Sequence, residues 1–276
     1  MNARGRSTVP VDYPDLMSGV FILRGMGLRI PAGALTIAIG EDGRPEMNLT
    51  KVEVSLDFWD PWLAIARDRA IEAVLQYRQT LTAHREGRSE AVGELFGSTL
   101  STAMMCMGAL GFSLDALYAS VKERMPDGVT ADIGSETASR HQFVHETLRR
   151  SARLSNQQAK HSRSVVQQIF RFRDAAVHPS GGWSEPVLHP ELGTGMAPGY
   201  VAFSAENAAR GYAATRSVIE VILANVRPQY AELAEWAGGS LQRLPEPLPP
   251  DIATEPSVDE SQDDDEAGGA ERALDC

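Results

Sequence analysis

Apolar residues recur with the period of an α-helix along two long stretches, and this pattern limits the fold more than any other feature. The first stretch runs from about Asp60 to Arg85, and the second from about Ser89 to Val121. In each, apolar side chains return every three or four residues, so they gather on one helical face and leave charged residues for the other. Two long helices that each bury one face are therefore predicted. The apolar positions of the first are Trp62, Ile65, Ala66, Ala70, Ala73, Val74, Tyr77 and Leu81.

The same periodicity predicts three further helices. They cover about Glu136–Arg153, Asn156–Val177 and the apolar run that follows Ser204. The Ser204 hydroxyl can cap the free amides of the last helix, and Pro179 ends the helix before it because proline lacks a backbone N–H. We therefore predict a mainly α fold, an up-and-down bundle of about five helices.

Short runs rich in β-branched residues precede the helices. Thr36–Ile39 and Val52–Val54 are separated by the turn-forming run Gly40–Gly43. Runs of this kind around a turn are typical of paired strands, so a small antiparallel β element is predicted. We assign residues 1–56 to an N-terminal β-rich extension and residues 57–244 to the helical bundle.

Charge is distributed unevenly along the chain, whose formal net charge is −11. Residues 251–276 hold ten acidic side chains and one arginine, a net charge of −9, so the first 250 residues carry only −2. The segment 245–276 is rich in proline and acidic residues and has too little apolar material to offset the entropy of ordering it. It is predicted to be an acidic, disordered tail.

The overall composition is that of a globular protein. Hydrophobic residues make up 43% of the chain and charged residues 23%, which excludes a fibrous or wholly disordered protein. No stretch approaches the roughly 20 apolar residues of a membrane-spanning helix, and no secretory apolar core follows the polar start. Cys106 and Cys276 offer no disulfide framework. We expect a cytoplasmic chain with no membrane partner.

The segment Phe170–Pro179 is the one short run that specifies chemistry. It reads Phe-Arg-Phe-Arg-Asp-Ala-Ala-Val-His-Pro, in which Arg173 is followed by a polar residue, three spacers and His178. This run resembles the signature of the HEPN domain, an arginine followed after four to six residues by a histidine. The surrounding helices fit the same family over roughly Phe58–Gly239. The resemblance implies a HEPN-like bundle of four or five helices.

Elementary geometry is compatible with a joint role for Arg173 and His178. Residues five apart on a continuous helix are separated by about 140° around its axis, so the two side chains would not share a face. Pro179 pushes the residue before it toward extended dihedral angles, which lets the helix end and turns His178 back toward Arg173. His178 could then move a proton near neutral pH, and Arg173 could stabilise charge on a phosphate. Asp174 could orient either of them.

The resemblance implies metal-independent cleavage of RNA to a 2′,3′-cyclic phosphate, with no cofactor. Family members usually work as homodimers in which two Arg-His pairs share a groove, and some are toxins with an antitoxin partner. Toxins with a nucleotidyltransferase antitoxin often carry tyrosine two residues after the histidine, and Ser180 stands there in this chain. The family also includes non-catalytic members, so a helical interaction or scaffolding module is the alternative interpretation.

Basic residues gather between Arg140 and Arg173, where eight basic side chains meet one acid, Glu146. The closest group, Arg149, Arg150 and Arg153, would form an RNA-binding patch near the groove if the third and fourth helices pack side by side. Charges scattered over a solvated helix face are the alternative. His141 and His145 have helical spacing but no recognisable third ligand, so no metal site is predicted.

Overall fold

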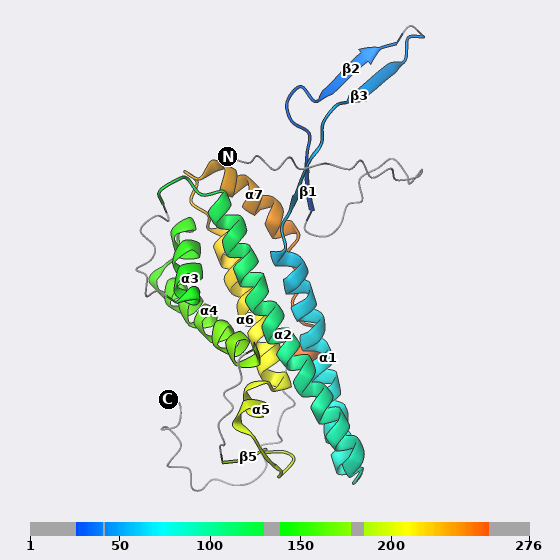
Figure 1. The fold of residues 1–276 in the computed structure, drawn as a ribbon, viewed down its shortest axis with the longest axis vertical. Helices are drawn as coiled ribbons and strands as arrows, with labels where there is room; N and C mark the ends of the chain where they lie inside the picture. The colour runs from blue at the N-terminus through cyan, green and yellow to red at the C-terminus, as the bar shows by residue number, and fades with distance from the viewer. Residues whose placement is uncertain (1–25, 41, 130–138, 178–184, 254–276) are drawn as a thin grey trace, which may run out of the picture. The chain divides into compact units, whose positions relative to one another are not determined.

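The computed structural model describes residues 26–40, 42–129, 139–177 and 185–253. The protein is mainly helical with an antiparallel strand element before the first helix, which confirms the predicted fold class (Figure 1). The chain divides into two compact units between Asp57 and Phe58. Each unit is described by itself.

Two long helices, α1 (Trp59–Arg85) and α2 (Ser89–Glu123), lie side by side and are joined by a tight turn. Gly87 occupies that turn with a φ of 70°, a left-handed conformation that side chains with a Cβ rarely adopt. Both helices begin and end close to the predicted bounds. Their facing surfaces provide much of the hydrophobic core, including Trp59, Leu63, Ala66, Ala70, Ala103, Met107, Leu110 and Leu114.

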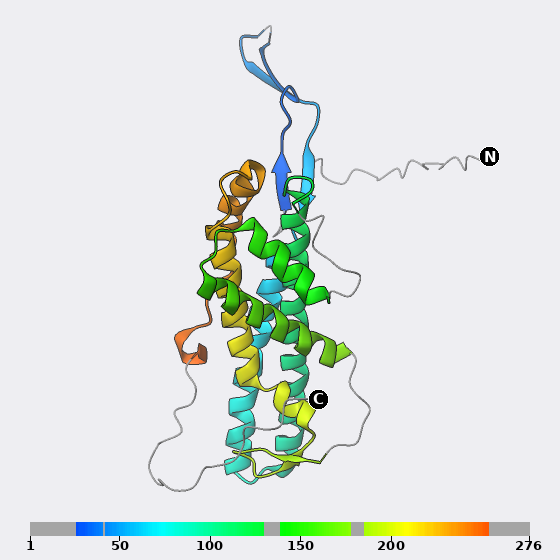
Figure 2. The same cartoon turned by 90° about the vertical axis from the view of Figure 1, so that its left-hand side faces the viewer.

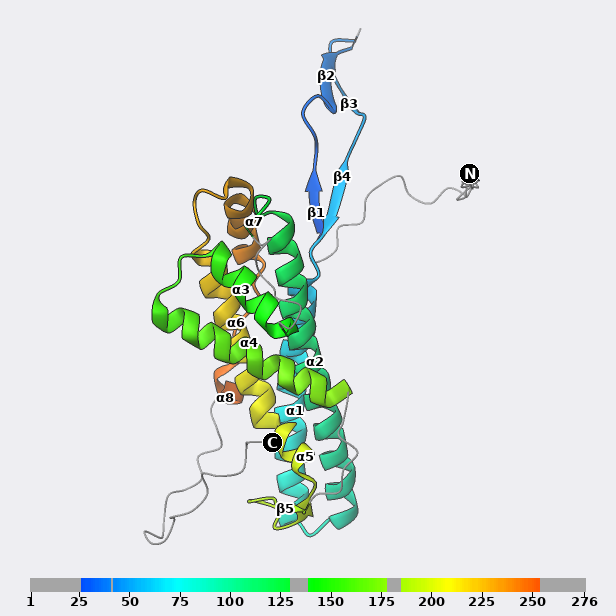
Figure 3. The same cartoon turned by 60° about the vertical axis from the view of Figure 1, so that its left-hand side comes forward.

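The remaining helices pack around this pair. Helix α4 crosses α2, and α3 lies beside α4 (Figures 2 and 3). Helix α6 begins after the predicted cap, where the Ser204 hydroxyl accepts a hydrogen bond from the Asn207 amide over 3.1 Å. The bounds are α3 Arg140–Ser151, α4 Asn156–Val177, α5 Pro198–Ala202, α6 Ala205–Ala224, α7 Ala231–Gln242 and α8 Pro250–Ala253.

Local capping explains where α3 and α4 begin. The Ser139 amide donates to the Gln142 side-chain oxygen over 2.8 Å, and this capping box starts α3 at Arg140 rather than at the predicted Glu136. An equivalent pair starts α4: Ser155 stands just before the helix and exchanges hydrogen bonds with Gln158 in its first turn. Helix α4 ends at Val177, as predicted, and Pro179 lies outside the described residues.

The predicted disordered tail is wrong for residues 245–253. Leu248 and Ile252 are buried in the helical core, and the Tyr212 hydroxyl donates to the Glu246 carbonyl over 2.5 Å. Two well-spaced apolar side chains are enough to dock this proline-rich strap. The rest of the predicted tail, residues 254–276, lies outside the described residues.

Helix α2 is more apolar than expected for a chain in which no membrane-spanning stretch was predicted. By length and composition it could cross a membrane, since its most apolar 18-residue window has a mean hydropathy of 1.4. Of that window 56% is buried against other parts of the protein. A central core helix passes the same test, so the observation is weak evidence for a membrane span.

The N-terminal unit contains two antiparallel strand pairs. Strand β1 (Met26–Arg29) pairs with β4 (Glu53–Leu56), and β2 (Leu35–Ile39) pairs with β3 (Pro45–Leu49). The antiparallel element is confirmed, but the two predicted runs do not pair with each other: Thr36–Ile39 lies in β2 and pairs with β3, and the second run overlaps β4, which pairs with β1. A third short pair, β5 (Val187–Leu188) and β6 (Gly195–Met196), lies between α4 and α6 in the chain.

Candidate functional site at the end of α4

Arg173 lies near the end of α4 and is held by carboxylates from two helices. Its Nη1 donates to Asp115 of α2 over 2.7 Å, and its Nε and Nη2 donate to Asp174 over 3.0 and 2.8 Å. Only 17% of the Arg173 side chain is exposed. Charge-assisted hydrogen bonds of this length fix the direction of a guanidinium, so Arg173 is a positioned cation.

Gly111 lets the Arg173 side chain cross α2. A Cβ at Gly111 would lie 2.8 Å from the Arg173 Cδ, closer than real atoms approach, so any larger residue would displace the arginine. The guanidinium carbon lies 4.3 Å from the centre of the Phe170 ring. An aromatic face at this distance attracts a cation. The aliphatic part of the Arg173 side chain is thus confined by α2 at Gly111, and its guanidinium by the Phe170 ring.

Asp115 joins three helices at this point. In addition to Arg173 of α4, its carboxylate accepts from the Arg140 Nε of α3 over 2.8 Å. Sequence reasoning missed Asp115, yet a signal was present, because Asp115 is the only charged residue between Glu94 and Lys122. A lone acid in an otherwise uncharged stretch of a core helix needs a partner.

His141, in the first turn of α3, lies within electrostatic reach of this cluster. Burial lowers the pKa of His141 first, and the positive charges of Arg171 and Arg163 lower it further, while Asp174 opposes the shift. A lowered pKa keeps the imidazole neutral at neutral pH. His141 is thus a helix-face histidine that senses the charges of Arg171, Arg163 and Asp174.

The described residues bring together only part of the predicted catalytic set. Arg173 and Asp174 contact each other, and Asp115 and Arg140 join them. His178, the third predicted catalytic residue, lies outside the described residues, as does Ser180. The convergence of Arg173 and His178 therefore stays a prediction.

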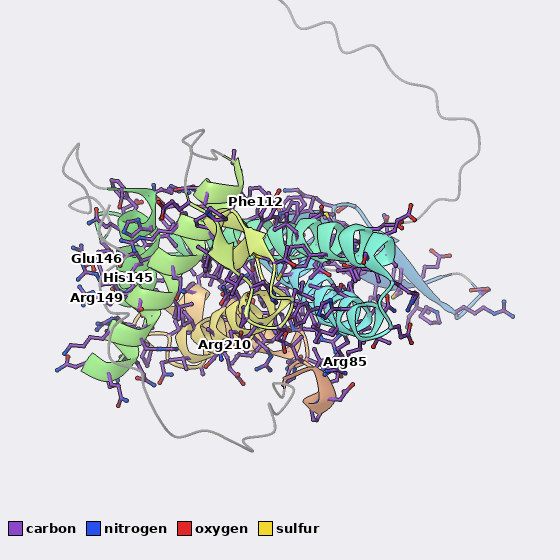
Figure 4. All side chains as sticks on the ribbon, turned by 90° about the horizontal axis from the view of Figure 1, so that it is seen from below. Arg85, Phe112, His145, Glu146, Arg149 and Arg210 are labelled. Atoms are coloured by element: carbon purple, nitrogen blue, oxygen red, sulfur yellow. The ribbon has the colours of Figure 1, made fainter. Side chains whose placement is uncertain are left out.

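The predicted RNA-binding arginines lie at the other end of α4. Helices α3 and α4 do pack side by side, but Arg153 precedes α4 and Arg173 lies near its end, roughly 30 Å farther along at 1.5 Å per residue. Arg153 is therefore far from the Arg173 guanidinium, and the RNA-binding role of Arg149, Arg150 and Arg153 stays a prediction. Figure 4 shows His145, Glu146 and Arg149 together along α3.

Glu146 forms ion pairs with two of the predicted RNA-binding arginines, Arg149 and Arg150. Arg149 donates to it through Nε and Nη2 over 2.7 and 2.6 Å, and Arg150 donates through Nε over 2.9 Å. The hydrogen bond from Arg149 is the largest cause that lowers the pKa of Glu146 to about 2. Arg150 also donates to the Val129 carbonyl over 2.8 Å. Arg150 therefore serves the structure, whereas Arg153 has an exposed side chain.

A shallow cavity of about 360 Å³ opens beside Arg153. Arg149, Arg153 and Arg227 line it, and no acidic residue does. The backbone of Arg153 donates to the Asn225 carbonyl over 2.8 Å, which straps the turn between α3 and α4 to the end of α6. Three arginines around a small cavity could accept an anionic group.

Among the residues that the structure describes, no group of three metal-ligating side chains occurs. The His145 Nε2 lies 3.2 Å from the Ala159 carbonyl, and burial is the largest cause of its lowered pKa. His145 therefore packs between α3 and α4.

Comparison with protein-family models, with curated proteins and with solved structures finds no match to this chain. The resemblance to the HEPN domain thus rests on the Arg173–His178 run and its helical context in this sequence.

Proposed function

We propose that this chain is a metal-independent endoribonuclease of HEPN type that acts in the cytoplasm, with Arg173 and His178 as its working pair. The observation that carries the proposal is the fixed guanidinium of Arg173, five residues before a histidine-proline pair. Two carboxylates and the gap at Gly111 hold it in place. A cation fixed before the substrate arrives stabilises developing negative charge without having to reorganise.

Arg173 keeps donors for a substrate. A guanidinium has five N–H groups, and three of those of Arg173 point at Asp115 and Asp174. The remaining two can bind the oxygens of a phosphodiester. Asp174 is 59% exposed and can yield its place to a phosphate, whereas Asp115 is only 25% exposed and keeps the guanidinium aligned.

The proposed reaction is an internal transfer. A neutral His178 accepts the proton of the RNA 2′-hydroxyl, and the 2′-oxygen attacks the adjacent phosphorus. The bond from phosphorus to the 5′-oxygen breaks, and a protonated histidine, supplied by a second copy in a homodimer, donates the proton that the leaving oxygen needs. Arg173 stabilises the charge on the five-coordinate phosphorus. An antitoxin partner would be expected to cover this site.

The test is cleavage of mixed RNA by the purified chain in EDTA, with analysis of the product ends. We expect 2′,3′-cyclic phosphate ends, and we expect His178→Ala to abolish cleavage while its thermal unfolding stays close to that of the wild-type chain. Arg171→Ala is the matched control, because Arg171 is exposed on the same helix. Absence of cleavage by the wild-type chain, or an active His178→Ala variant, would reject the proposal.

A non-catalytic interaction module is the second candidate. It is favoured by the same ion pairs, since Arg173 between two carboxylates can serve only to join α2 and α4. In that case Arg173→Ala would lower stability, and neither the wild-type chain nor the variant would cut RNA.

A further inference from the structure

One face of the β2–β3 hairpin is wholly apolar and exposed. In this ladder Leu35 pairs with Leu49, Ile37 with Met47 and Ile39 with Pro45, and directly paired residues point to the same side of a two-stranded sheet. Of these side chains, Ile39 is 79% exposed, Met47 72% and Ile37 64%. The opposite face carries Thr36, Ala38, Glu46 and Asn48.

The β1–β4 ladder repeats the pattern. Leu28 pairs with Val54 and Met26 with Leu56, and Leu28, Val54 and Leu56 are exposed. Strands normally alternate in this way when one face is covered and the other meets water. A two-stranded ribbon by itself is marginally stable in water, so these apolar faces need a cover.

We propose that the apolar face of β2–β3 is the dimerisation surface of this protein, and that its occupant is the same face of a second copy. The face is composed of Leu35, Ile37, Ile39, Pro45, Met47 and Leu49. None of these side chains is charged, so two identical faces meet without repulsion. A two-fold pair uses the same patch on both chains.

The size of the face fits this occupant. Its large side chains present on the order of 600 Å² per copy, so two copies would bury on the order of 1,200 Å², the lower end of the range for stable protein interfaces. Its composition agrees, because permanent homodimer interfaces are the most apolar class, whereas transient interfaces resemble ordinary surface. This inference deepens the proposed function, which already calls for a homodimer: it names the surface that holds the two copies together, and it is argued without reference to RNA cleavage.

The test is the mass of the full chain in solution, measured by light scattering over a range of concentrations. We expect a dimer for the wild-type chain. The variant Ile37→Lys/Met47→Lys places two like charges on the face of each copy and should be monomeric. The matched control Thr36→Lys/Asn48→Lys adds the same charge to the neighbouring pair on the opposite face, and it should stay dimeric.

A wild-type chain that is monomeric at tens of micromolar would overturn the proposal, as would a dimer that survives Ile37→Lys/Met47→Lys. Loss of the dimer in both double variants alike would also overturn it. Circular dichroism checks that each variant folds. Should the lysine variant unfold, Ile37→Thr/Met47→Thr keeps strand-forming residues and must still weaken the dimer. RNA cleavage is assayed separately, so a failed dimer and a failed ribonuclease are distinguishable.

Discussion

Two groups of arginines occupy opposite ends of the α3–α4 pair, and they differ in what holds them. Arg149 and Arg150 bond to Glu146, three or four residues away on the same helix. Arg173 bonds to Asp115, which is 58 residues away on α2, and Asp115 also holds Arg140 of α3. The ion pairs of Glu146 with Arg149 and Arg150 stay within one helix. The ion pairs of Asp115 with Arg173 and Arg140 join three helices and fix the position of the Arg173 guanidinium. We therefore expect the Arg173 end to position a substrate and the Arg153 end to attract anions in general.

Replacing Asp115 and Glu146, the acids that hold the two groups of arginines, should give the largest difference in the free energy of unfolding. Asp115→Ala leaves two arginines without their shared acceptor, one of them largely buried, and we expect it to lower the free energy of unfolding by about 1–3 kcal/mol. Glu146→Ala removes pairs three and four residues apart on one helix, each worth about 0.3–0.5 kcal/mol. Urea unfolding of both variants measures the difference. Equal losses would erase the distinction between the two ends.

Two glycines of α2 allow a sharper test of the Arg173 end. Gly111→Ala puts a Cβ where the Arg173 stem passes, so we expect cleavage to fall. At Gly108 an added Cβ meets nothing within 4 Å. Gly108→Ala should therefore keep full activity and stabilise the protein by up to about 1 kcal/mol through helix propensity. Cleavage rates and thermal unfolding give the comparison, and full activity in Gly111→Ala would show that the position of Arg173 is unimportant.

The contribution of Glu146 to stability should depend on pH. The pKa of Glu146 is depressed from 4.5 to about 2, so its stabilising contribution is present above pH 4.5 and is lost as the pH falls toward 2. We expect the wild-type chain to be more stable than Glu146→Gln near neutral pH, and the difference to shrink between pH 4.5 and 2. Thermal unfolding of both proteins across this range is the measurement. A difference that stays constant with pH would contradict the assignment.

The smallest effect is expected for replacement of Arg153, the exposed arginine in the turn before α4, and it concerns RNA affinity. If Arg153 contacts one phosphate, Arg153→Ala should weaken RNA binding uniformly across sequences and reduce the salt dependence of the affinity by about 0.7 in logarithmic slope. Fluorescence anisotropy at several salt concentrations measures this. An unchanged slope would remove Arg153 from the binding surface.

The limits of sequence reasoning follow the same contrast between local and distant contacts. The bounds of α1 and α2 follow from periodicity, and those of α4 follow from periodicity, from the Ser155 and Gln158 cap and from a proline two residues beyond its end. All of these signals act within a few residues. The pairs of Glu146 could also be expected from helical spacing. Asp115 and the strap at Leu248 depend on partners far away in the chain, so no local pattern places them. Helix α7 was not predicted.

The most direct test of the account compares two substitutions two residues apart on α4. Single-turnover cleavage of one RNA in EDTA is measured for Arg173→Ala and Arg171→Ala. The account predicts that Arg173→Ala lowers the rate by about 100-fold or more, the usual cost of losing one preorganised charge stabiliser, and that Arg171→Ala stays near the wild-type rate. Equal rates for the two variants would contradict it.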